Sequence, residues 1–141
     1  MNFNNDFKYD LEIGLEGERI VDDLFKNKRI EVKRDSWIGR SGNIAVEYES
    51  RGKPSGIAKT QADYWLFIFS KEYEDKVMLI VETNKLKKVA RNYYNKGSIK
   101  AMGDSNTSYS VLIPIKDISS FKKGQSNRYN LKESRSWSLK V

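Results

Sequence analysis

Residues 29–50, RIEVKRDSWIGRSGNIAVEYES, contain two runs in which apolar and polar side chains alternate. The runs 29–35 and 44–50 have the period of two that is typical of β-strands with one face in a core. The segment between them contains Gly39 and Gly42, which favour a loop. We therefore expect the two runs to pair as an antiparallel hairpin.

The expected hairpin gathers acidic side chains on one face. Because side chains alternate along a strand, Glu47 and Glu49 should point the same way. Matching the faces of the two strands fixes the parity of the register, and one register of that parity sets Asp35 opposite Ala45. Lys33 then lies opposite Glu47, and Asp35 becomes a diagonal neighbour of Glu47. A divalent cation would turn these acids into ligands, whereas the alternative is a solvated face with a Lys33–Glu47 ion pair.

The rest of the chain shows patterns of further helices and strands. Residues 11–27 predict a helix with Asp10 as its N-cap, and its apolar stripe should pack on a sheet. Glu18 lies on that stripe. The other expected elements are strands over 62–70, 76–82 and 109–115 and a helix over 83–97, the first two strands forming a hairpin. This order predicts an α/β fold with a mixed sheet.

The composition limits the chemistry that the chain can carry. Its 141 residues suit one compact domain, and they include neither cysteine nor histidine. Disulfides, zinc sites built from cysteine or histidine, and histidine-based acid–base catalysis are therefore excluded. A metal bound by this chain should be one that prefers oxygen ligands, such as Mg²⁺ or Mn²⁺. The polar, acidic start and the lack of a long apolar run predict a cytoplasmic protein.

Charge is unevenly distributed along the chain. Residues 1–25 carry two basic and seven acidic side chains, whereas residues 26–59 carry nine basic and four acidic ones. Residues 122–141 form a basic C-terminal extension with six basic and one acidic side chain. Trp37, Tyr129 and Trp137 lie within the basic blocks, a mixture that favours nucleic acid as the partner. A basic surface that serves only solubility is the alternative.

The order of these motifs resembles that of a nuclease family. An acid in the first helix, an aspartate on a strand and Glu-x-Glu on the next strand are similar to the PD-(D/E)xK nuclease fold. The order is most similar to that of the archaeal-type Holliday junction resolvases and their phage relatives. The resemblance spans roughly residues 14–70, through GLEGERIVDDLF, EVKRD, GNIAVEYESRGKPSGI and TQADYW. Two positions depart from the family pattern, because Arg34 replaces its proline and Glu49 its lysine.

The resemblance implies a fold, an activity and a site. The fold would be a restriction-endonuclease-like α/β/α core with a mixed central β-sheet, formed as a single nuclease domain by residues 1–121. The activity would be Mg²⁺- or Mn²⁺-dependent, structure-selective cleavage of DNA, most similar to Holliday junction resolution by a homodimer. Metal ligands would be Glu18, Asp35 and Glu47. Glu49 would orient or deprotonate the attacking water, and Lys33 or Lys59 would supply the missing positive charge.

The segment RGKPSGIAKTQ, residues 51–61, is the expected DNA contact. Its small residues let the backbone approach phosphates, and its basic side chains add charge. The alternative is a basic surface turn. The expected DNA-binding residues are Arg40, Arg51, Lys53, Ser55, Lys59 and Gln61.

Two other functions remain open. One is a restriction- or repair-type endonuclease of the same fold. The other is a non-catalytic nucleic-acid-binding protein, which the replacement of the motif lysine by Glu49 favours. A phage protein that acts in the host cytoplasm would satisfy the resemblance. The expected homodimer would use exposed aromatic residues, either Tyr64, Trp65, Phe67 and Phe69 or Tyr93 and Tyr94.

Overall fold

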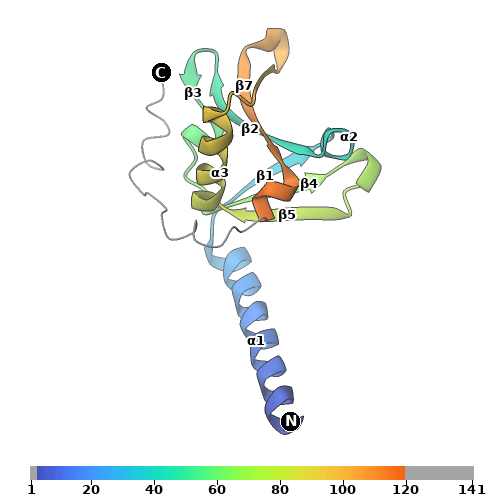
Figure 1. The fold of residues 1–141 in the computed structure, drawn as a ribbon. Coiled ribbons are helices and arrows are strands. Elements are labelled where there is room, and N and C mark those ends of the chain that lie inside the picture. The colour runs from blue at the N-terminus through green and yellow to red at the C-terminus, as the bar shows by residue number, and fades with distance from the viewer. Residues whose placement is uncertain (1–2, 120–141) are drawn as a thin grey trace.

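The computed structural model describes residues 3–119 and has a mixed α/β architecture, as the sequence predicts (Figure 1). The basic extension, with Tyr129 and Trp137, lies outside the described residues. The helices are α1 (Phe3–Asn27), α2 (Ile38–Ser41), α3 (Thr83–Asn95) and α4 (Ile115–Ser119), with short 3-10 turns η1 (Gly56–Ala58), η2 (Lys71–Tyr73) and η3 (Asp104–Asn106). The strands are β1 (Ile30–Asp35), β2 (Asn43–Ser50), β3 (Lys53–Pro54), β4 (Tyr64–Phe69), β5 (Val77–Glu82), β6 (Ile99–Met102) and β7 (Ser108–Pro114).

The strands form two sheets rather than one. In the mixed sheet, of order β1-β4-β5, β1 runs parallel to β4 with Ile30 opposite Tyr64 and Asp35 opposite Phe69. The expected hairpin of residues 62–70 and 76–82 is confirmed as the antiparallel pair β4–β5. The second sheet, of order β3-β2-β7-β6, is antiparallel throughout. The predicted mixed sheet is therefore present, and a separate antiparallel sheet adjoins it.

The predicted hairpin of residues 29–35 with 44–50 is wrong. The two strands exist, but α2 separates them and each belongs to a different sheet. β1 takes β4 as its neighbour and β2 takes β7, both of which are apolar strands from distant parts of the sequence. Because Lys33 lies opposite Phe67, the expected Lys33–Glu47 pair does not form. Alternation correctly identified the two strands. It did not determine their partners, and the assumption that strands adjacent in sequence pair with each other was wrong here.

One apolar core joins the two sheets, α2, α3 and α4. β4 contributes Trp65 and Phe67, and α3 contributes Leu86 and Ala90, all fully or almost fully buried. β2 and β7 contribute the buried residues Ile44, Val46, Val111 and Ile113. The aromatic run of β4 is therefore core. As a consequence it cannot supply the expected dimer surface, because Trp65, Phe67 and Phe69 are all buried.

Helix α1 is longer than expected and projects away from the two sheets (Figure 1). It begins at Phe3, so Asp10 lies inside the helix and is not its N-cap. Ile20, Val21 and Phe25 are exposed, and among the described residues of the apolar stripe only Leu24 is buried. The expected packing of this stripe on a sheet is therefore absent within the described part of the chain.

Strand β6 is an element that the sequence patterns did not predict. It spans only Ile99–Met102 and pairs with β7, Lys100 lying opposite Ser110. A run of four residues that includes one lysine shows no clear alternation. The strand is therefore recognised only by its pairing with β7. β6 matters for the site because it positions Lys100.

Candidate nucleic-acid interface

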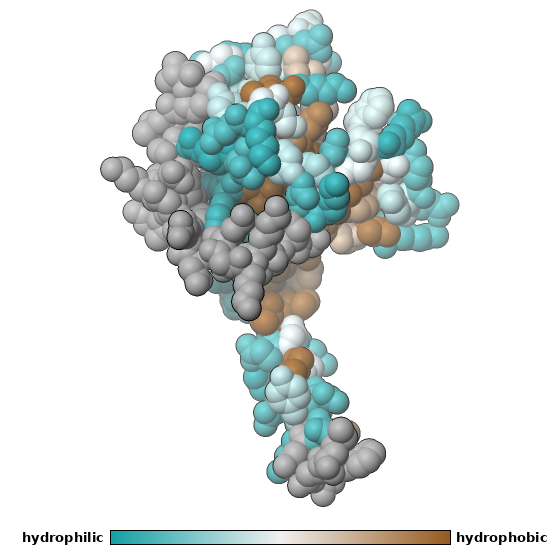
Figure 2. Space-filling view, in the orientation of Figure 1, coloured by the Kyte–Doolittle hydropathy of each residue, from teal (hydrophilic) through white to brown (hydrophobic). Residues whose placement is uncertain are grey.

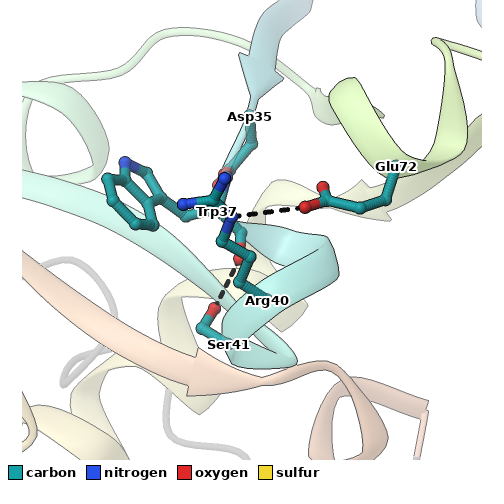
Figure 3. A network of polar contacts seen from close by, with 5 residues as sticks. All are labelled: Asp35, Trp37, Arg40, Ser41 and Glu72. Atoms are coloured by element: carbon teal, nitrogen blue, oxygen red, sulfur yellow. Dashed lines mark hydrogen bonds and ion pairs between the residues drawn. The ribbon is translucent and has the colours of Figure 1, made fainter.

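The site is centred on Trp37, which follows β1 at the start of α2. The Trp37 backbone N–H donates to Asp35 Oδ1 at 2.8 Å, and Ser41 Oγ donates to the Trp37 carbonyl oxygen at 2.9 Å (Figure 3). The next residue, Ile38, is buried in the core. Because Ile38 and these polar contacts anchor the backbone on both sides, the indole is directed outward and is 54% exposed.

Three cations surround the exposed indole. The centroid of the Trp37 ring lies 5.6 Å from Arg40 Cζ, 5.9 Å from Lys71 Nζ and 5.9 Å from Lys100 Nζ. These residues come from α2, η2 and β6, so the cluster forms only when distant parts of the chain meet. Each distance is within the range of a cation–π contact. We call Trp37, Arg40, Lys71 and Lys100 the Trp37 platform.

The cations of the platform differ in how far they are neutralised. Arg40 Nε donates to Glu72 Oε1 at 3.3 Å, the ion pair that is drawn in Figure 3. A backbone hydrogen bond within Glu72, together with the Arg40 guanidinium, keeps the pKa of Glu72 below its ordinary value. Among the described residues, Lys71 and Lys100 form no salt bridge within 4 Å. These two lysines therefore keep their charge available for an anion.

An exposed indole ringed by cations has a definite binding chemistry. The ring face can stack on a planar base, and the surrounding ammonium and guanidinium groups can contact phosphates. Nothing in this arrangement needs a particular base, because every base offers a π-face. The platform is therefore suited to an unpaired nucleotide with its flanking phosphates.

The predicted acids Asp35 and Glu47 lie in different sheets. Asp35 ends β1, is half-buried and holds the Trp37 N–H, which places it beside the platform. Glu47 lies on β2, where Ser55 Oγ donates to its Oε1 at 2.7 Å. The turn that carries Ser55 also places Gly56 against the Glu47 backbone, so closely that a Cβ there would lie 2.2 Å from the carbonyl oxygen. This turn therefore holds Glu47 in place.

Glu49 does not share the face of Glu47, contrary to the sequence prediction. The register of β2 on β7 shifts at Tyr48, so that Glu47 lies opposite Ser110 and Glu49 opposite Tyr109. Ser110 and Tyr109 are consecutive in β7 and point to opposite faces of the sheet. Burial, and then the nearby Tyr94 and Glu49 groups, raise the pKa of Tyr48 to about 12. Glu49 is thus associated with a group of tyrosines.

The expected set of metal ligands is not gathered in the described chain. Glu18 lies on α1, away from both sheets (Figure 1), and Asp35 and Glu47 belong to different sheets. Within residues 3–119 no three acidic side chains lie close enough to hold one metal ion. Lys33 forms an ion pair with Glu31 at 2.8 Å and lies 5.5 Å from the Trp65 ring centroid. The arrangement of Glu18, Asp35 and Glu47 therefore does not fit a shared ion.

The expected DNA-binding residues occupy two separate places. Arg40 belongs to the Trp37 platform. Arg51 and Lys53 are exposed on the turn around β3, Lys59 and Gln61 are exposed before β4, and Ser55 is engaged by Glu47. Gln61 also accepts a hydrogen bond from Arg29 at 3.4 Å. Sequence reasoning missed Lys71 and Lys100, because isolated lysines far apart in sequence give no local signal.

The aromatic residues proposed for a dimer surface are engaged within the chain. Tyr93 is half-buried, and its hydroxyl donates to Asp117. The ring of Tyr94 packs edge-on against Tyr48, with centroids 5.2 Å apart. With the β4 aromatics buried, the exposed large apolar residues lie mainly on α1 and on the mixed sheet.

Comparison of the chain with protein-family models, curated proteins and solved structures found no match. Among the described residues, no helix is both long enough and apolar enough to cross a membrane.

Proposed function

We propose that this protein binds DNA through the Trp37 platform and prefers branched, frayed or otherwise unpaired DNA. The observation that carries the proposal is the 54% exposed indole with three cations within 6 Å of its centroid. A basic surface that served only solubility would not require an exposed indole at the centre of its charges. Stacking of a base on an aromatic side chain contributes about 1–3 kcal/mol, and adjacent phosphate contacts add a salt-dependent term.

The preference for unpaired DNA follows from the geometry of stacking. In a continuous duplex both faces of every base pair are already covered by neighbouring pairs. An indole can therefore stack only at an end, a nick, a branch point or a base that has left the helix. The platform offers no helix of a length suited to the major groove, since α2 has only four residues. Recognition by shape, as at a four-way junction, is the mode that these contacts favour.

Cleavage of the bound DNA is a second proposal. Asp35 holds the backbone of Trp37, so an acid lies directly beside the surface on which DNA would rest. This position, together with the resemblance to PD-(D/E)xK nucleases, supports a Mg²⁺- or Mn²⁺-dependent endonuclease of the junction-resolving kind with the fold of that family. The described chain alone does not present three acids for one ion, so bound DNA or a rearrangement would have to complete such a site.

Binding is tested by fluorescence anisotropy with a labelled four-way junction, a forked duplex and a blunt duplex. The Trp37→Ala variant should weaken binding to the junction and fork about 10- to 100-fold, the range expected for one lost base stack. Binding to the blunt duplex should change much less. Tyr9→Ala is the control, because it removes an exposed aromatic ring from α1, away from the platform. Equal affinity of wild type and Trp37→Ala for the junction would overturn the binding proposal.

Cleavage is tested separately by incubating each labelled DNA with Mg²⁺ and with a chelator. Asp35→Asn and Glu47→Gln should abolish metal-dependent cutting while junction binding persists. Junction cutting that survives both substitutions would remove these acids from the reaction. Equal cutting of junction and duplex would favour the restriction- or repair-type enzyme. Binding without any cutting would leave a non-catalytic DNA-binding protein.

A further inference from the structure

Helix α1 presents a long apolar stripe that no described part of the chain covers. Phe7, Leu11, Val21 and Phe25 lie on one side of the helix, because they differ by four, ten and four residues, and all four are exposed. Figure 2 shows hydrophobic surface where α1 meets the body and a smaller hydrophobic patch partway along the helix. Gly14 is in the middle of the helix with nothing near it, at a cost of roughly 1 kcal/mol relative to alanine. An isolated helix of this kind in water is poorly stabilised.

A second apolar surface lies on the outer face of the mixed sheet. Trp65 and Phe67 point into the core, so by alternation Leu66 and Ile68, with the residues paired with them on β1 and β5, form the other face. On that face Val32 is 52% exposed and Met78 is 56% exposed, and Ile80 is also exposed. A sheet face with this composition normally packs against a helix.

Helix α1 is held away from the sheet of its own chain. Only Lys28 and Arg29 connect α1 to β1. The Arg29 N–H donates to Asp63 Oδ2 at 2.8 Å, and the Arg29 carbonyl accepts from the N–H groups of Asp63 and Tyr64 at 2.8 and 3.1 Å. These bonds attach the connection to β4. A return of α1 onto its own sheet would have to break them, because the chain must reverse within the same two residues.

We propose that the apolar stripe of α1 docks on the outer face of the mixed sheet of a second copy of this chain, in a two-fold symmetric swapped dimer. Charge favours this occupant. α1 carries seven acidic and three basic side chains, net −4, whereas residues 28–119 carry 17 basic and 11 acidic ones, net +6. An acidic helix is therefore attracted to the basic body of a partner. Two-fold symmetry forms the same contact twice.

Pairing of α1 with the α1 of another copy is the less favourable arrangement. A two-stranded coiled coil is stabilised by apolar residues repeated along its seam, and each polar residue in the seam lowers its stability. Here the seam would contain Gly14 and Glu18 between Leu11 and Val21. Packing on the sheet tolerates both residues, because a glycine allows close approach and a long glutamate can reach the edge of the contact.

The first experiment measures the mass of the full-length protein in solution by light scattering. Wild type should have twice the 16.4 kDa mass of one chain. Val21→Glu with Phe25→Glu should weaken the dimer at least about 100-fold, and Val32→Glu with Met78→Glu should do the same from the other side of the contact. Tyr9→Ala removes an exposed ring from the opposite side of α1 without changing the charge of the helix, and it should leave a dimer. A monomeric wild type overturns the proposal.

The second experiment identifies the two surfaces that meet. Since the chain has no cysteine, Val21→Cys and Met78→Cys each introduce a single thiol. Circular dichroism first confirms that each variant is folded, which is expected because both positions are exposed. A bis-maleimide should then crosslink a mixture of the two variants far more efficiently than either variant alone. Efficient crosslinking of Val21→Cys to itself would instead indicate helix pairing and would overturn the docking on the sheet.

Discussion

Trp37 shows how one residue acquires a role from neighbours that are distant in sequence. Its indole is exposed because Ile38 enters the core and Asp35 and Ser41 hold the backbone. Lys71 and Lys100, from η2 and β6, add positive charge beside the exposed ring. A single exposed tryptophan is common on protein surfaces, whereas one ringed by cations has a defined ligand chemistry.

The lysines of the platform should act as phosphate contacts. Lys71→Ala or Lys100→Ala should each lower the slope of log affinity against log salt concentration by about one, because each phosphate contact releases about one counterion. Lys76→Ala is the matched control, since Lys76 is held by Glu74 at 2.8 Å and lies outside the platform. Anisotropy titrations of the junction over a range of salt give the slope. If the slope is the same in wild type and in the platform variants, Lys71 and Lys100 do not contact phosphates.

Tyr48 should make stability fall at high pH. Burial raises its pKa to about 12 in the folded chain, whereas an unfolded tyrosine titrates near 10. Between these values the folded chain retains a proton that the unfolded chain loses, so the free energy of unfolding decreases as pH rises from about 10 to 12. Urea unfolding at several pH values should show this loss in wild type. The Tyr48→Phe variant should lose less stability over the same range, and identical curves would contradict the assignment.

At the scale of elements, the turn from β2 to η1 determines the position of Glu47. Ser55 donates to the Glu47 carboxylate, and Gly56 lies against the Glu47 backbone. The register shift at Tyr48 then turns Glu49 toward the side of Tyr109. A bulge of this kind re-aims a side chain without ending the strand. Alternation alone would have kept both acids on one face.

Gly56 should be the most sensitive residue of this turn. Its φ of +51° and the 2.2 Å approach of a built Cβ to the Glu47 carbonyl oxygen both exclude a side chain. Gly56→Ala should lower the free energy of unfolding by roughly 2–4 kcal/mol, because strain is added to a clash with backbone. Gly52→Ala is the control, since it also has a positive φ but has open space around it, and it should cost only about 1–2 kcal/mol. Equal losses in urea unfolding would show that the close contact is unimportant.

At the scale of the whole molecule, cleavage and dimerisation should be coupled if both proposals hold. Resolution of a four-way junction needs two incisions, and a symmetric dimer supplies two sites. On a supercoiled plasmid that extrudes a cruciform, wild type should produce linear DNA. The Val21→Glu, Phe25→Glu variant should produce nicked circles, because its two incisions are no longer paired. Gel electrophoresis over time separates these products, and linear product from the variant at the wild-type rate would contradict the coupling.

The sequence by itself determined most of the local structure. Alternation identified β1 and β2, the apolar runs identified β4, β5 and β7, and helical spacing identified α1 and α3. These elements are set by periodicity, which is a property of neighbouring residues. The sequence also limited the chemistry, because a chain without cysteine and histidine must rely on carboxylates, hydroxyls, amines and aromatic rings. The basic block around Trp37 includes Arg40, which lies in the candidate interface, and its contact with nucleic acid stays a prediction.

Only the tertiary structure decided how these elements meet. β1 and β2 each found a partner far along the chain, because an apolar strand such as β4 or β7 buries more surface than an adjacent half-polar strand does. That choice separated Asp35 from Glu47, and the bulge at Tyr48 separated Glu47 from Glu49. The same folding brought Lys71 and Lys100 to Trp37 from positions that no local pattern connects. Periodicity depends on residues that are close in sequence, whereas the burial of apolar surface depends on contacts between distant parts of the chain. The residues of the candidate site could therefore be identified only from the tertiary structure.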